Sequence, residues 1–179
     1  GQTGADILIA RGEDDPEELE EFGELGVFAY LAADAVFKGF EFEAAADLGQ
    51  VGSTLFSADV VVDYVDAELD EADAAGNDEL PRIPPLGIIA GLQADLPAGS
   101  LRAEVEYAAE ADETVSFELP TDAFTLFNLY ADWNITDKLT LSVAGLNLSD
   151  EEARLHTSFI KDQVPLPGRN VRFAVRYQF

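Results

Sequence analysis

Apolar and polar residues alternate along most of this chain, and such alternation indicates strands whose two faces meet different surroundings. One face of the last segment carries only apolar residues, namely Val171, Phe173, Val175, Tyr177 and Phe179. Its other face carries Arg172, Ala174, Arg176 and Gln178. An apolar face opposite a pair of arginines fits a strand that lies between lipid and a wet lumen. A strand of a soluble sandwich can show the same pattern, so one strand alone does not decide the fold class.

The same alternation recurs upstream of the last segment. It predicts strands within residues 40–48, 56–64, 86–96, 101–109, 127–133 and 139–143, and a shorter run at 5–10 predicts the end of one more. Together with 171–179, these make about eight antiparallel strands. We expect Leu129, Ala131, Val105 and Leu141 to face lipid with Val171, Phe173 and Val175. We expect the opposite face, toward the lumen, to carry Glu104, Asp132, Arg172 and Arg176.

The connections between these strands alternate in length. Residues 49–53, 97–100 and 134–138 form tight turns, whereas 11–26, 66–85, 110–122 and 147–168 form long loops. Outer-membrane barrels have short turns on the periplasmic side and long loops outside the cell. The sequence therefore predicts an all-β, antiparallel transmembrane barrel whose last strand runs inward, so that Phe179 ends at the periplasmic rim. Trp133, Tyr177 and Phe179 then suit an interfacial aromatic girdle, with ordinary core filling as the alternative.

Composition narrows the possible functions. The chain has 179 residues and a formal net charge of −26, from 36 acidic and 10 basic residues, so binding to nucleic acid is excluded. No apolar run approaches the roughly 18 residues of a membrane helix. The chain begins Gly-Gln-Thr-Gly without a signal peptide, and we expect that a longer precursor supplies its front. The acidic bias fits either a salty habitat or the concentration of a cationic ligand at the outer surface.

No catalytic constellation is present in the sequence. It contains one histidine, His156, and no cysteine, and it lacks a nucleophile elbow, a phosphate loop and a His-Glu-x-x-His motif. We therefore expect no enzymatic activity and no cofactor.

Several segments resemble those of TonB-dependent receptors. They are 80–85 (Leu-Pro-Arg-Ile-Pro-Pro), 147–154 (Asn-Leu-Ser-Asp-Glu-Glu-Ala-Arg), 156–162, 165–170 (Pro-Leu-Pro-Gly-Arg-Asn) and 35–43, followed by a terminal strand that ends in Phe179. The resemblance covers most of the chain from about residue 27 onward. Their order, their spacing and their place at the end of the chain make the combination specific, although each motif alone is weak.

The resemblance implies that residues 1–179 are the C-terminal part of a receptor barrel in the bacterial outer membrane. Such a barrel has about 22 strands and a plugged lumen, of which this chain would supply roughly the last eight. The plug domain and the TonB-contacting segment (the TonB box) would lie in a missing N-terminal part. The implied function is energy-coupled uptake of a scarce nutrient. The implied partners are the TonB complex, outer-membrane lipid, a small-molecule or metal ligand, and the barrel-assembly machinery. That machinery would recognise an assembly signal formed by Phe173, Val175, Tyr177 and Phe179, although Phe179 also suits the lipid-facing girdle.

The sequence leaves the substrate open. The stretch around His156 is similar to receptors linked to zinc uptake, and zinc takes histidine and carboxylate ligands. Asp150, Glu151 and Glu152 lie nearby in sequence, so these four residues are candidate metal ligands, with an ordinary loop histidine as the alternative. Siderophores, haem, vitamins and oligosaccharides are further candidates. Two other architectures also stay open: a complete eight-stranded barrel, and a soluble acidic β-sandwich that binds cations.

Overall fold

A computed structural model describes residues 34–72, 78–115 and 118–179. They form a single antiparallel sheet with the strand order β1-β2-β3-β4-β5-β6-β7. The strands are β1 (Ala35–Val51), β2 (Thr54–Leu69), β3 (Gly87–Leu96), β4 (Gly99–Ala108), β5 (Phe124–Thr136), β6 (Leu139–Leu146) and β7 (Asn170–Tyr177). The seven strands predicted between residues 40 and 179 are therefore confirmed. The strand predicted at residues 5–10 and the loop predicted at 11–26 lie outside the described residues.

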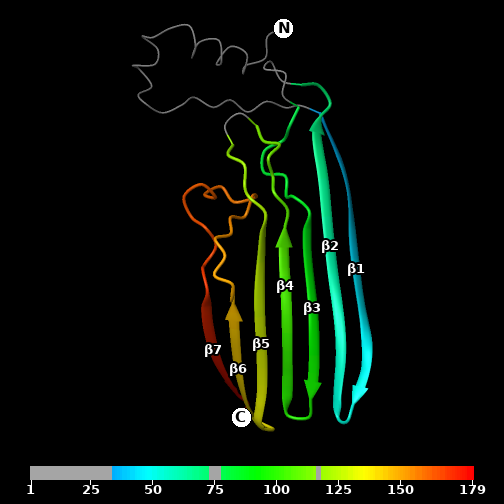
Figure 1. The fold of residues 1–179 in the computed structure, drawn as a ribbon, viewed down its shortest axis with the longest axis vertical. Helices are drawn as coiled ribbons and strands as arrows, with labels where there is room; N and C mark the ends of the chain where they lie inside the picture. Colours follow the sequence, from blue (N-terminus) through cyan, green and yellow to red (C-terminus); the bar gives the residue numbers. More distant parts are fainter. Residues whose placement is uncertain (1–33, 73–77, 116–117) are drawn as a thin grey trace. The chain divides into compact units, whose positions relative to one another are not determined.

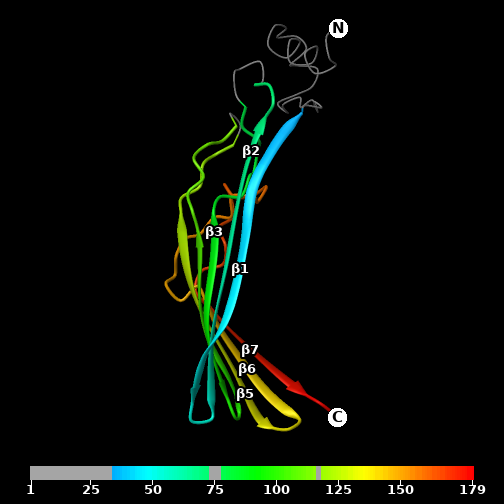
Figure 2. The same ribbon diagram turned by 90° about the vertical axis from the view of Figure 1, so that its right-hand side faces the viewer.

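Short turns gather at one end of the sheet and long connections at the other, as the sequence predicts (Figure 1). Residues 52–53, 97–98 and 137–138 form the short turns, and residues 70–86, 109–123 and 147–169 link the strands at the opposite end. Seen from the side, the sheet is twisted, so that the strands at its two edges diverge toward the short turns (Figure 2). No helix among the described residues has the length and apolar character needed to cross a membrane.

The pairing of the strands places the residues of each predicted face on the same side of the sheet. Across the sheet, Gln93 pairs with Arg102, Arg102 with Tyr130, Tyr130 with Ala144, and Ala144 with Arg172, so these residues share one face. On the other face, Ala103 pairs with Leu129, Leu129 with Gly145, and Gly145 with Val171. The predicted division into a polar and an apolar face is thus confirmed.

The apolar face is largely uncovered in this sheet. Phe173 is 73% exposed, Val175 69%, Trp133 60% and Leu92 59%. Soluble monomers rarely expose a contiguous apolar surface of this kind, whereas a barrel presents one to lipid. All the described strands belong to one sheet, with no second sheet packed against it, so the sandwich alternative is not supported.

The hairpin of β1 and β2 is longer than predicted and has a change of character along its length. The strands have 17 and 16 residues, whereas about 9–11 residues cross a membrane. The rings of Phe40 and Tyr64 meet with their centres 6.0 Å apart. Between this contact and the short turn, the apolar face of the hairpin stays apolar. Beyond that contact the same face carries Lys38 and Glu68, which pair at 3.9 Å. The hairpin therefore continues as strand past the end of its apolar band.

Two strands contain irregularities that the alternation does not show. The register shifts between Asp47 and Gly49 in β1, and between Asn134 and Thr136 in β5. Each shift leaves one apolar residue, Leu48 or Ile135, without a partner in the ladder, which is the pattern of a β-bulge. Both bulges lie beside short turns, where they increase the local twist.

A small core lies at the long-loop end. Phe124, Leu126 and Ala153 are buried together, with Ala108 and Leu166 packed against them. This core anchors the 147–169 connection to β5 and β4.

Candidate functional site

The single histidine is buried in a polar cluster that joins two long connections. We call Glu118, Thr121, His156 and Lys161 the loop clasp. Thr121 Oγ1 lies 2.9 Å from His156 Nδ1, and Lys161 Nζ lies 3.1 Å from the same nitrogen. Lys161 Nζ also donates to Glu118 Oε1 at 2.8 Å, and His156 Nε2 lies 3.5 Å from that oxygen. The clasp therefore ties 147–169 to 109–123.

The clasp fixes the tautomer of the histidine. An ammonium group has donors and no acceptor, so the contact with Lys161 requires an unprotonated Nδ1. The proton of the neutral ring then lies on Nε2, which faces Glu118 Oε1. The side chains of His156, Glu118 and Lys161 are only 3–5% exposed, so water does not replace these contacts.

Burial and charge shift the pKa values within the clasp. Burial lowers the pKa of His156 from its usual value, and the Lys161 ammonium lowers it further, against an opposing effect of Glu118. Burial alone would raise the pKa of Glu118. The hydrogen bonds from Lys161 and from the backbone N–H of Arg82, together with the positive charge nearby, outweigh burial, so the pKa of Glu118 is lowered. A neutral imidazole and an ionised carboxylate are the forms that this arrangement favours.

A third connection also reaches the clasp. The backbone N–H of Arg82 donates to Glu118 Oε2 at 3.1 Å. The Arg82 guanidinium lies 3.8 Å from the ring centre of Phe159, a cation–π contact. Glu118 is thus the carboxylate at which the 70–86, 109–123 and 147–169 connections meet.

The structure does not bring the other candidate metal ligands to His156. Asp150 accepts hydrogen bonds from the backbone N–H of Arg169 at 2.8 Å and from its Nη2 at 3.3 Å, and these bonds lower the pKa of Asp150. Glu152 pairs with Arg154 at 2.9 Å. The backbone N–H of Glu151 donates to the side chain of Asn147. Within the described residues, no group of three or more His, Cys, Asp or Glu is placed to hold a metal ion.

Asn147 organises the start of the 147–169 connection. Its Nδ2 donates to the carbonyl of Glu151 at 2.8 Å and to that of Pro167 at 3.3 Å, while its Oδ1 accepts from the Glu151 N–H at 2.9 Å. Its φ of 48° is left-handed, a conformation that asparagine tolerates better than most residues. Asn147 opens one of the family motifs, but nothing in the sequence around it indicates this role.

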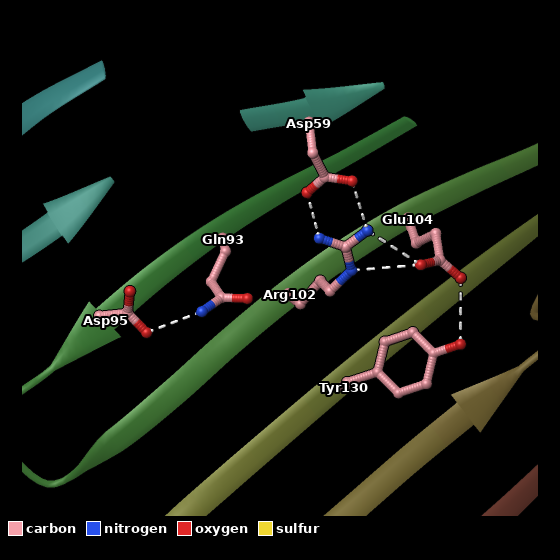
Figure 3. Close-up of polar contacts among 6 residues, drawn as sticks. All are labelled: Asp59, Gln93, Asp95, Arg102, Glu104 and Tyr130. Carbon is pink, nitrogen blue, oxygen red and sulfur yellow. Dashed lines mark hydrogen bonds and ion pairs between the residues drawn. The ribbon is translucent and has the colours of Figure 1, made fainter. Parts of the chain in front are cut away.

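A second polar network crosses the lumenal face of β2 to β5, where Figure 3 shows it. Arg102 on β4 makes a bidentate pair with Asp59 on β2 and also contacts Glu104. Glu104 accepts hydrogen bonds from Tyr130 at 3.1 Å and from Asn128 at 3.3 Å on β5. These side chains connect β2, β4 and β5 on the polar face, across the intervening β3.

A glycine makes the reach of Arg102 possible. Asp59 and Glu104 lie on either side of Gly91 in the ladder. A Cβ atom built at Gly91 would collide with the Arg102 guanidinium. The guanidinium therefore occupies the space that a side chain on β3 would fill.

The residues of the predicted assembly signal alternate along the apolar face from Phe173 in the middle of β7 to Phe179 beyond its short-turn end. Tyr177 is 56% exposed and Phe179 is fully exposed. Their rings meet edge to face with centres 5.4 Å apart. This placement suits both lipid contact and recognition by assembly machinery.

The single sheet, its short turns and long connections, and its two faces are those of part of the wall of a transmembrane β-barrel. More specifically, the chain belongs to the family described as TonB dependent receptor-like, beta-barrel, whose model matches residues 8–148. The family resemblance seen in the sequence motifs is thereby confirmed.

Among solved structures, the fold is similar to "Copper transporter OprC", with a TM-score of 0.68 and 22% sequence identity. The match covers 82% of this chain and 24% of that protein, so the chain spans about a quarter of its length. No curated protein matches.

Proposed function

We propose that this chain is the C-terminal part of the barrel of an outer-membrane receptor that imports a scarce nutrient with energy delivered through TonB. The observation that carries the proposal is the match of a receptor-barrel family to 141 of the 179 residues, 8–148. It is supported by the one-sheet architecture with short turns at one end and long connections at the other. The plug domain and the TonB box belong, in this proposal, to an N-terminal part of the protein.

The two edges of the sheet support a larger barrel. Each of β1 and β7 has one neighbour in the described sheet. Unpaired backbone N–H and C=O groups cost several kcal/mol each in hydrocarbon. Both edges therefore need further strands, and we propose that earlier strands of the same protein provide them.

The proposed substrate class is a metal ion, a metal chelate or another small ligand. The name of the similar copper transporter agrees with a metal substrate. A sequence identity of 22% supports a shared fold and does not identify the substrate of this protein. A zinc site at His156 would need the histidine to leave Thr121 and Lys161 first. We therefore place the ligand-binding groups of the proposed transporter outside the closed loop clasp.

Uptake in the native organism tests the proposal. We expect deletion of the gene to abolish high-affinity accumulation of one nutrient, with zinc and copper tested first, followed by iron chelates and haem. Inactivation of TonB should have the same effect, and the gene restored on a plasmid should recover uptake only where TonB is intact. Normal uptake of every nutrient in the deletion strain, or recovery of the protein outside the outer-membrane fraction, would contradict the proposal.

A further inference from the structure

The loop clasp has a property that transport by the barrel does not require. We infer that it is a proton-operated latch, closed while His156 is neutral and released when His156 binds a proton. The inference concerns the three connections at the long-loop end and does not rest on the proposed transport function.

The geometry of His156 carries the inference. Its Nδ1 is the acceptor for Lys161 Nζ at 3.1 Å and faces Thr121 Oγ1 at 2.9 Å. A proton on Nδ1 removes this acceptor and places an imidazolium directly against an ammonium. Both side chains are almost completely buried, at 3% and 4% exposure, so solvent does not screen the repulsion. Protonation and the closed clasp are therefore incompatible.

The charges around His156 offset this repulsion only in part in the closed form. Glu118, from the 109–123 connection, already accepts from Lys161 and from the backbone of Arg82. Arg154, on the same connection as His156, donates to the carbonyl of Lys161 and pairs with Glu152, so it brings no carboxylate to the histidine. The carboxylate of the clasp, Glu118, is already matched by the Lys161 ammonium, so it offsets a further cation only weakly.

A cavity beside the clasp offers a destination for the released ring. It has a volume of about 190 Å³ and is lined by His156 and Arg154, and also by Asp63 of β2 and Glu106 of β4. Asp63 supplies negative charge that an imidazolium outside the clasp can use, and Glu106 adds to that charge when it is ionised. The open form is therefore the one that tolerates the proton.

Release of the clasp would separate all three connections. Glu118 holds the 147–169 connection through Lys161 and the 70–86 connection through the backbone of Arg82. Phe159, which covers Arg82, lies on the same connection as His156. The hydrogen bond from the backbone N–H of Asn147 to Asn128 Oδ1 on β5 and the Phe124 core remain as the anchors of 147–169 to the sheet. We therefore expect the loop to loosen without unfolding of the barrel.

The direction of the pH dependence follows from the proton affinity of His156, which is lower in the closed form than in the open form. The pKa of His156 is lowered from 6.5 in the clasp, so the open form binds the proton more tightly. The clasp is then fully stable above the ordinary histidine pKa and loses stability as pH falls below it. For one proton, the ratio of open to closed forms rises by up to about tenfold per pH unit in this window.

Hydrogen exchange of the complete protein in detergent, read by mass spectrometry, tests the latch. We expect peptides from 109–123 and 147–169 to lose protection between about pH 7.5 and about pH 5, the range in which histidine changes charge, after correction for intrinsic exchange rates. Peptides from β3 and β4 should keep their protection. The expected loss in the two loops is about tenfold or more.

His156→Gln is the decisive variant, because a glutamine carbonyl accepts from Lys161 and Thr121 but does not take up a proton in this range. We expect its loops to stay protected at both pH values. Asp162→Asn, which removes an exposed carboxylate beside Lys161, serves as the matched control and should respond to pH as the wild type does.

Three outcomes overturn the inference: no change in the wild type, an unchanged response in His156→Gln, or loss of the response in Asp162→Asn. If His156→Gln is already loose at the higher pH, the full pH titration of the wild type decides. A midpoint between about 5 and 6.5 supports His156 as the trigger, since histidine titrates there. A midpoint near 4 assigns the change to carboxylates instead and overturns the latch.

Discussion

At the scale of single residues, the polar network around Arg102 depends on a glycine, Gly91, which leaves space for the guanidinium. The Arg102 guanidinium passes over Gly91 to reach Asp59. We predict that Gly91→Ala displaces the guanidinium and lowers stability by about 0.5–1.5 kcal/mol, because the pair is partly exposed and such pairs contribute little more. Thermal unfolding of the complete protein, followed by heat-modifiable migration on gels, measures the effect.

A double-mutant cycle separates this clash from a general cost of alanine in β3. In an Arg102→Ala background, Gly91→Ala should be neutral or slightly stabilising, because no guanidinium occupies the space and alanine restricts the unfolded chain more than glycine does. Equal losses in both backgrounds would show that the glycine serves some other purpose.

The residues of the loop clasp illustrate what the sequence could not reveal. His156 stands out in the sequence as the only histidine, and the carboxylates nearest to it along the chain are the partners that the sequence suggests. Its actual partners include Glu118 and Thr121, which are 38 and 35 residues away. Contacts of this kind depend on how two long loops pack, which alternation does not encode. One signal is available in the sequence. Basic residues are scarce and acidic residues abundant, so Lys161 is expected to pair with a carboxylate.

At the scale of elements, alternation predicts the strands well where one face meets lipid and the other the lumen. It predicts the end of β2 at residue 64, whereas the strand continues to Leu69. Beyond Tyr64, Ala67 is buried and Glu68 is exposed on what had been the apolar face. The apolar and polar positions exchange sides there, because above the membrane the outer face meets water and the inner face packs against loops. When apolar and polar positions exchange faces, the alternation is interrupted. A prediction based on alternation alone therefore ends the strand at that point.

The face assignment of β7 gives a second prediction. Val175 lies on the apolar face and is 69% exposed, and it pairs with Leu141 in the register. We expect Val175→Arg to reduce folding into lipid bilayers by up to about 2–4 kcal/mol, with a smaller cost if the residue lies near the interface. Equilibrium unfolding of the complete protein from vesicles provides the measurement.

Two control substitutions close to Val175 accompany Val175→Arg. Ala174→Arg places the new charge on the lumenal face next to Ser142, and Gln178→Arg places it past the end of β7. Both should cost much less than Val175→Arg. Equal costs for all three variants are the result that would refute the assignment of the apolar face to lipid.

At the scale of the whole molecule, the described strands make an open sheet and not a closed barrel. We predict that residues 1–179 expressed alone fail to form a stable monomeric barrel in detergent, because the first and last strands of a partial barrel would each keep an unpaired edge. Size-exclusion chromatography with light scattering, together with resistance to heat on gels, provides the test. A monomeric, heat-modifiable species in which residues 5–10 pair with 171–179 would establish the small-barrel alternative.

Gly91 also limits how this region can change in evolution. A larger residue at this position is compatible only with loss or redirection of Arg102, and loss of Arg102 leaves Asp59 on the lumenal face without its bidentate partner. We therefore expect positions 59, 91 and 102 to covary, although they lie on three different strands. In related barrels, substitution at any one of the three should be accompanied by substitution at the others, and a glycine kept beside an arginine would mark the same bridge across β3.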